Sequence, residues 1–142
     1  APAPPRPRQR DPAHAAGARE SLAAAGRSGT VDVVVGPAAD TLRGLVADGP
    51  PPASLAAVAP ATPSTPDDLP RALRLSRPGT LHVEDNTVRG GAVADAASTD
   101  PNVLGVREMA DRVVADPRLD ATAVQTVGSK GYDGFVLARV RG

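Results

Sequence analysis

Residues 80 to 91, TLHVEDNTVRGG, run from an apolar, strand-like stretch into three polar residues and then a pair of glycines. The apolar and β-branched residues that begin at Thr80 predict a strand ending at Glu84. Asp85 and Asn86 follow at its carboxyl end, where open α/β sheets place their ligand sites. Carboxylate and amide oxygens at such a position suit a hard divalent cation. The alternative is a simple turn, because Asp and Asn favour turns.

Helices and strands alternate along the chain on both sides of this stretch. Apolar spacing and helix-start signals predict helices over 12–25, 38–49, 67–77 and 101–115. Runs of β-branched or apolar residues predict strands over 30–35, weakly over 54–59, and over 80–84, 121–127 and 134–140. The last two strands pair as a terminal hairpin. The pattern predicts an α/β fold whose sheet is parallel first and antiparallel at its end.

The composition limits the classes of protein. The 142 residues suffice for one domain, but one Tyr, one Phe and no Trp leave little bulk for its core. A net charge of zero gives no field that favours nucleic acid. No apolar stretch reaches the roughly 18 residues of a membrane span, and the first residues, APAPPRPRQR, lack the apolar core of a signal peptide. We expect a cytoplasmic protein with a disordered Pro/Arg-rich arm over 1–10 and one partial domain over 11–142.

Several motifs together resemble a known family. Residues 71–140 carry RPGTLHVEDN, RGGAVAD, REMADRVVADPR and a final hairpin, in that order. With these motifs in this order, the chain resembles, over most of residues 9–142, the carboxyl-terminal two-thirds of a class I S-adenosylmethionine-dependent O-methyltransferase of the metal-dependent, caffeoyl-CoA and catechol O-methyltransferase-like group. RDPAHAAGARESLAAAG (10–26) is similar to the helix after that family's second strand. VDVVVGPAADTL (31–42) is similar to its third strand and the following turn.

The resemblance gives the polar strand end a role. It implies that Asp85 and Asn86 are two ligands of a Mg²⁺ or similar divalent cation, which orients an acceptor hydroxyl and lowers its pKa. A third carboxylate ligand and a lysine base belong to the end of the family's fourth strand. Those places fall on Ala59 and Thr62, which can serve neither role. We therefore expect an incomplete metal site and assign no catalytic residue.

The resemblance also implies a partial site for S-adenosylmethionine. The turn of Gly36, Pro37 and Ala38 matches the one whose backbone contacts adenine. Gln9 falls where the family has an acidic residue on the ribose hydroxyls, so a charge-assisted bond is lost. The glycine-rich cofactor loop has no counterpart. An ordinary strand-to-helix turn is the alternative for residues 36–38.

The family's strand order, 3-2-1-4-5-7-6, raises a topological problem. The chain matches strands 3 to 7 and is expected to lack strands 1 and 2, which would leave the strand over 30–35 without a neighbour. We therefore expect a truncated, degenerate member that methylates a hydroxyl of a small acceptor weakly or not at all. The alternative is a non-catalytic remnant or fragment that acts only by association with a partner chain. The resemblance also implies association of identical subunits.

Two further features have structural explanations. His82 lies in the middle of its strand without Cys or His partners nearby, which favours a structural histidine over a metal ligand. Arg107, Glu108, Asp111 and Arg112 are predicted to form a charged outer helix face with i,i+4 pairs.

Overall fold

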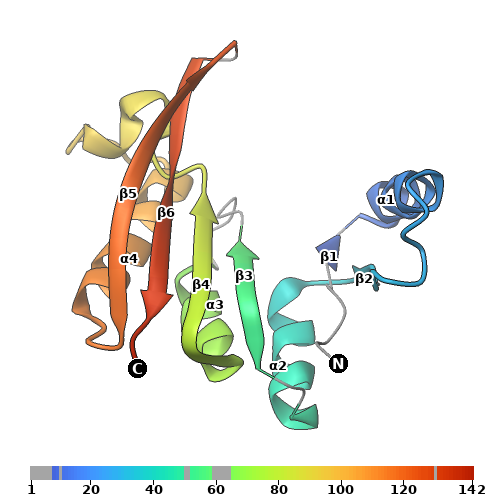
Figure 1. Cartoon of the computed structure of the whole chain (residues 1–142). Coiled ribbons are helices and arrows are strands. Elements are labelled where there is room, and N and C mark those ends of the chain that lie inside the picture. The colour runs from blue at the N-terminus through green and yellow to red at the C-terminus, as the bar shows by residue number, and fades with distance from the viewer. Residues whose placement is uncertain (1–7, 10, 50–51, 59–64, 130) are drawn as a thin grey trace. The chain divides into compact units, whose positions relative to one another are not determined.

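The computed structural model describes residues 8–9, 11–49, 52–58, 65–129 and 131–142. The chain divides into two compact units, residues 1–51 and 52–142. Each unit has a sheet of its own (Figure 1). Within the described ranges, no helix has the length and apolar character that a membrane crossing requires.

The first unit holds two short strands and two helices. In chain order they are β1 (Arg8–Gln9), α1 (Pro12–Ala24), β2 (Val34–Val35) and α2 (Ala38–Asp48). Asp11 caps α1: its Oδ1 accepts a hydrogen bond from the backbone N–H of Ala13 at 2.8 Å. A proline at the first helical position completes the start signal, since its missing N–H costs nothing there. The predicted first helix is confirmed.

The strand predicted over 30–35 is shorter than expected and has a neighbour. Only Val34–Val35 is a strand, and it pairs in parallel with β1, Arg8 beside Val34 and Gln9 beside Val35. The expectation of an unpaired strand is therefore wrong. A two-residue strand such as β1 shows no periodicity, so the sequence pattern could not reveal it. Arg8 and Gln9 belong to the stretch predicted as a disordered arm, whose residues 1–7 and 10 lie outside the described residues.

The second unit contains the remaining elements. In chain order they are β3 (Ala53–Val58), α3 (Thr65–Arg74), β4 (Ser76–Asp85), the 3₁₀ segment η1 (Arg89–Ala94), α4 (Pro101–Ala115), β5 (Leu119–Gly128) and β6 (Gly131–Val140). Its sheet has the order β3-β4-β6-β5. The β3–β4 pair is parallel, whereas β6 is antiparallel to both β4 and β5. The predicted α/β fold, parallel first and then antiparallel, is confirmed.

The core of this unit lies between one face of the sheet and two helices. α3 and α4 lie together on that face (Figure 1). The buried apolar cluster draws on both helices and on the last two strands and consists of Leu69, Leu73, Met109, Val113, Leu119, Val136 and Ala138. We call this side the helix-covered face. Small and branched side chains fill it, and Met109 is the largest side chain that is fully buried.

Because the side chain of Met109 is fully buried in the core, we predict that the stability of the fold depends strongly on it. Met109→Ala should lower the free energy of unfolding by about 2–5 kcal/mol, because it removes apolar contact and leaves a cavity. Val114→Ala on the same helix is the matched control, since Val114 is 86% exposed. It should change stability by about 0.5 kcal/mol or less. Urea denaturation followed by circular dichroism measures both, and equal effects would contradict the assigned core.

Candidate functional site

Asp85 and Asn86 lie at the carboxyl end of β4. Asp85 is exposed and Asn86 half-buried. Asn86 has φ of 58°, the left-handed conformation that Asn tolerates better than most residues. Its Nδ2 donates a hydrogen bond to Oδ2 of Asp85 at 3.2 Å. The pair thus forms a turn in which the two side chains lie next to each other.

The loop after this pair is held by Asp133 from β6. Oδ1 of Asp133 accepts hydrogen bonds from the backbone N–H groups of Val88, Arg89 and Gly134, each at 2.9 Å. Burial raises the pKa of Asp133, but these hydrogen bonds and the positive charge of Arg89 outweigh it and hold the pKa below its usual value. The carboxylate is therefore ionised and fixed at neutral pH. No sequence motif indicates this role for Asp133.

Two glycines let the loop and the hairpin approach closely. A Cβ on Gly91, whose φ is 95°, would collide with the hydroxyl of Tyr132. A Cβ on Gly134 would lie 2.5 Å from the carbonyl oxygen of Val124 and 2.6 Å from Cγ2 of Val88. A larger residue at position 134 would push the loop and the hairpin apart, because it meets backbone. At position 91 it would displace the Tyr132 side chain and would be strained by the positive φ.

A side chain of α4 holds the other end of the loop. Nε of Arg107 donates to the carbonyl oxygen of Val93 at 2.9 Å, and its Nη2 donates to the carbonyl oxygen of Asp95. The prediction of a purely outward-facing charged patch is therefore wrong for Arg107. It is confirmed for Arg112, whose Nη2 pairs with Oε1 of Glu108 at 2.6 Å.

The described residues do not complete a metal site. Among them, no group of three His, Cys, Asp or Glu side chains could hold an ion. Val58 pairs with Glu84, so the chain leaves β3 at the same end of the sheet as Asp85. Ala59 and Thr62, which come next, lie outside the described residues. Two adjacent oxygen-bearing side chains, one hydrogen-bonded to the other, do not fit the octahedral demand of Mg²⁺.

The residues predicted to contact the cofactor meet at one edge of the first unit. Gln9 ends β1 beside Val35, and Gly36 follows Val35 directly. Gly36 has φ of 138°, which favours glycine, and Pro37 is the N-cap of α2. Helix α2 begins at Ala38, so the peptide N–H groups of Ala38 and Ala39 have no carbonyl partner within the helix, whereas the N–H of Asp40 donates to the carbonyl oxygen of Pro37 at 3.2 Å. This edge can offer hydrogen-bond donors to a polar ligand.

His82 lies on the helix-covered face and is fully buried. Its Nε2 lies 2.9 Å from Oγ of Ser76, whereas its Nδ1 has no hydrogen-bond partner among the described residues. Burial lowers the pKa of this imidazole. The histidine is structural, as predicted, but only one of its nitrogens is satisfied.

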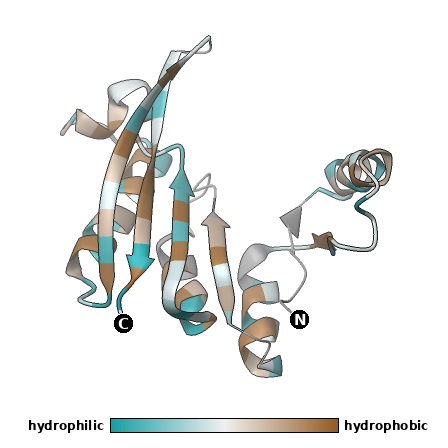
Figure 2. Cartoon of the chain, in the orientation of Figure 1, coloured by the Kyte–Doolittle hydropathy of each residue, from teal (hydrophilic) through white to brown (hydrophobic). Residues whose placement is uncertain are grey.

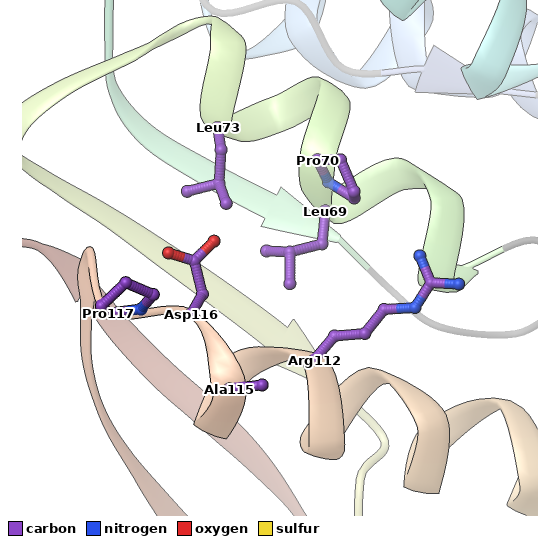
Figure 3. A pocket seen from close by; sticks show the side chains of 7 residues that line it. All are labelled: Leu69, Pro70, Leu73, Arg112, Ala115, Asp116 and Pro117. Atoms are coloured by element: carbon purple, nitrogen blue, oxygen red, sulfur yellow. The ribbon is translucent and has the colours of Figure 1, made fainter.

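A groove of about 450 Å³ opens between α3 and α4 (Figure 3). Leu69, Pro70 and Leu73 lie on one side and Arg112 and Asp116 on the other. A hydrogen bond from Arg118 lowers the pKa of Asp116. None of the predicted site residues lines this groove.

The comparisons with known proteins agree with the folded arrangement. Residues 8–141 match the sequence family described as O-methyltransferase. The chain belongs to the O-methyltransferase family. It is 42% identical over 131 residues to a catechol O-methyltransferase of Niastella koreensis, covering 92% of this chain and 59% of that protein.

Solved O-methyltransferases have the same fold. The enzyme from Bacillus cereus, in complex with SAH, superposes with a TM-score of 0.92 at 39% identity, over 96% of this chain and 62% of its own. An O-methyltransferase from Streptomyces achromogenes, in complex with SAM, gives a TM-score of 0.91 at 40% identity, over 96% and 61%. The present chain therefore spans about three-fifths of these relatives.

The observed strand order agrees with the order 3-2-1-4-5-7-6 that the resemblance implies. β3, β4, β6 and β5 take the places of strands 4, 5, 7 and 6. β1 and β2 take the places of strands 2 and 3, so the expectation that strand 2 is missing is wrong for its last two residues. Gln9 thus ends one strand of the family fold, and Asp85 ends another.

The hydrogen bonds at Asp133 predict that this residue keeps the loop closed. Asp133→Ala should cost about 1–3 kcal/mol of stability, because three backbone donors lose a charged acceptor. Amide hydrogen exchange at Val88, Arg89 and Gly134 should become faster. Asp133→Asn, which retains one carbonyl oxygen, should have a smaller effect. Asp120→Ala, at an exposed carboxylate of β5, is the control, and unchanged exchange in Asp133→Ala would contradict the prediction.

The buried imidazole predicts a pH dependence of stability. The unfolded chain binds a proton at His82 near pH 6.5, whereas the folded chain disfavours it, so stability is lost as the pH falls through that range. His82→Gln should make the fall in melting temperature between about pH 7.5 and about pH 5.5 shallower, because one titrating group is gone. His14→Gln, at an exposed histidine, should leave the slope as it is. Equal slopes in all three proteins would refute the prediction.

Proposed function

We propose that this chain carries part of an O-methyltransferase that moves a methyl group from S-adenosylmethionine to a hydroxyl of a small acceptor in the cytoplasm. On its own the chain is weakly active or inactive. The observation that carries the proposal is the similarity, over 96% of the chain, to O-methyltransferases in complex with SAM or with SAH, the product of methyl donation. The name of the relative from Niastella koreensis suggests a catechol as acceptor.

In this reaction the acceptor oxygen attacks the sulfonium methyl group, the S–CH₃ bond breaks and an O–CH₃ bond forms. The hydroxyl proton leaves and SAH remains. Rate depends on holding the two reactants in line. Here Gln9 is proposed to hold the ribose, and the backbone of Gly36, Pro37 and Ala38 to hold the adenine. Because Gln9 is neutral, its hydrogen bond to the ribose is weaker than a carboxylate's.

The metal requirement is the second reason for weak activity. A divalent cation would have only Asp85 and Asn86 among the described residues. Mg²⁺ gives up its water reluctantly, so two ligands retain it poorly. We propose that the isolated chain does not keep Mg²⁺ at this place.

The second candidate function is association with a partner chain without catalysis. One observation favours it: apolar side chains remain exposed on the sheet of the second unit. In this case S-adenosylmethionine would find no site on the chain. The two candidates thus differ in whether the donor binds.

A nuclear magnetic resonance titration of the ¹⁵N-labelled chain with S-adenosylmethionine separates them. We expect amide shifts at Gln9, Gly36 and Ala38, in fast exchange because the affinity is low, and none at Asp120. Added Mg²⁺ should not strengthen them. Absence of any shift in a folded chain would leave only the non-catalytic function. Binding that Mg²⁺ tightens, and that Asp85→Ala weakens, would show that the metal site is intact after all.

A gain-of-function variant makes the same test sharper. Gln9→Asp restores an acidic residue at the ribose position, and a charge-assisted hydrogen bond should add about 1 kcal/mol, roughly a fivefold tighter Kd. Gln125→Asp, on the exposed strand β5, is the matched control and should not change the Kd. Equal affinities in the two variants would remove Gln9 from the proposed cofactor site.

A further inference from the structure

Strand β5 forms one edge of the sheet in the second unit. Among the described strands it pairs only with β6, over its whole length from Leu119 to Gly128. Its outer side therefore presents a row of backbone N–H and C=O groups to which another strand can bind. Every residue of β5 after Leu119 is exposed, including Val124 at 40% and Val127 at 83%. Since neither face of β5 is covered, a second strand has access along this edge.

The outer edge of β5 lacks the usual protections of an edge strand. Residues 121–128, ATAVQTVG, contain no charge and no proline. The register with β6 runs without a shift, so no bulge bends the edge away from a partner. Hydrophobic segments recur along β5 in Figure 2, and Thr122, Val124 and Thr126 are β-branched residues that favour strands. The edge thus has the sequence of a strand that is paired on both sides.

The charges beside β5 gather at its first end. Asp120 pairs with Arg141 at 2.7 Å and with Arg139 at 3.5 Å, so this end carries two arginines against one carboxylate. The other end, at Gly128, is uncharged. A parallel copy of the strand would bring two positive ends together, whereas an antiparallel copy places each charged end beside an uncharged one. The charge pattern therefore favours a second copy of this chain, related to the first by a two-fold axis.

The two-fold axis also fixes a register. In one continuous sheet, side chains that face each other across two strands lie on the same face, so the axis must pass beside a residue rather than between two residues. An axis at Val124 pairs residues 120–128 of the two copies completely. Thr122 then faces Thr126 of the other copy, and Asp120 faces Gly128. Pairs of Thr residues and of β-branched residues stabilise antiparallel strands, and no like charges meet.

We propose that β5 is a dimerisation surface, at which two copies of this chain pair antiparallel about Val124 and join their sheets into one. Because the contact rests on one strand from each copy, we expect a buried area at the low end of specific interfaces, below about 1,200 Å² in total, and a reversible dimer. The pairing involves neither the methyl donor nor a metal. Its test is therefore independent of the test of methyl transfer.

Disulfide cross-linking tests the proposed register, because the chain contains no cysteine of its own. In Val124→Cys the two introduced thiols lie opposite each other at the axis, with Cβ atoms about 5 Å apart, so mild oxidation should give a covalent dimer. Val127→Cys is the matched control at a more exposed residue. Its two thiols lie about 20 Å apart along the paired strands, so it should cross-link at least about tenfold more slowly. A mixture of Ala121→Cys and Val127→Cys should form the mixed dimer.

Sedimentation velocity over a range of concentrations of the whole chain tests the association itself. Val124→Lys should abolish the dimer, because two ammonium groups would face each other at the axis. Leu55→Lys, at an exposed residue of the opposite edge strand β3, should leave the dimer unchanged. Three results would overturn the proposal: a chain that is monomeric at all concentrations, equally fast cross-linking of Val124→Cys and Val127→Cys, or a dimer that Leu55→Lys abolishes and Val124→Lys does not.

Discussion

The loop that follows Asp85 and Asn86 is held in place by one carboxylate oxygen. Oδ1 of Asp133 accepts three backbone hydrogen bonds, two of them from the loop that follows Asp85 and Asn86. The loop needs such an acceptor because its backbone has left the sheet and is not yet helical. Arg107 completes the support from α4 by donating to two carbonyl oxygens. A negative side chain thus accepts from N–H groups at one end of the loop, and a positive side chain donates to carbonyl oxygens at the other end.

The sheet explains how Asp133 reaches that loop. β6 lies beside β4 in antiparallel register, with Phe135 opposite Asp85, so the start of β6 meets the end of β4. The β5–β6 hairpin therefore presents Asp133 and Tyr132 to the segment after Asp85. Gly134 and Gly91 permit the close approach because neither has a side chain. Pairing of two strands distant in sequence is what builds the site.

Local sequence signals predicted most of the helices and strands. The support of the loop after Asp85 depends instead on contacts between residues distant in sequence. Asp100 before Pro101 predicted the start of α4, which begins at Pro101 and ends at Ala115 as predicted. The strand over 80–84 was predicted to end at Glu84, one residue before the observed end at Asp85, although its start at Ser76 was missed. The support from Asp133 could not be predicted, because Val88 and Asp133 lie 45 residues apart and neither belongs to a local motif. β1 was missed for the opposite reason, since two residues are too few to form a pattern.

The contacts that hold the loop and the residues that would hold a ligand are separate sets. Asp133, Gly134 and Arg107 contribute hydrogen bonds and space, and the fold gains stability from them whether or not a metal binds. Ala59 and Thr62 occupy the sequence positions at which the resemblance implies a carboxylate ligand and a lysine base. The hydrogen bonds of Asp133 and Arg107 involve neither position. A well-ordered loop after Asp85 is therefore evidence of family and fold, and activity has to be judged from the ligand set itself.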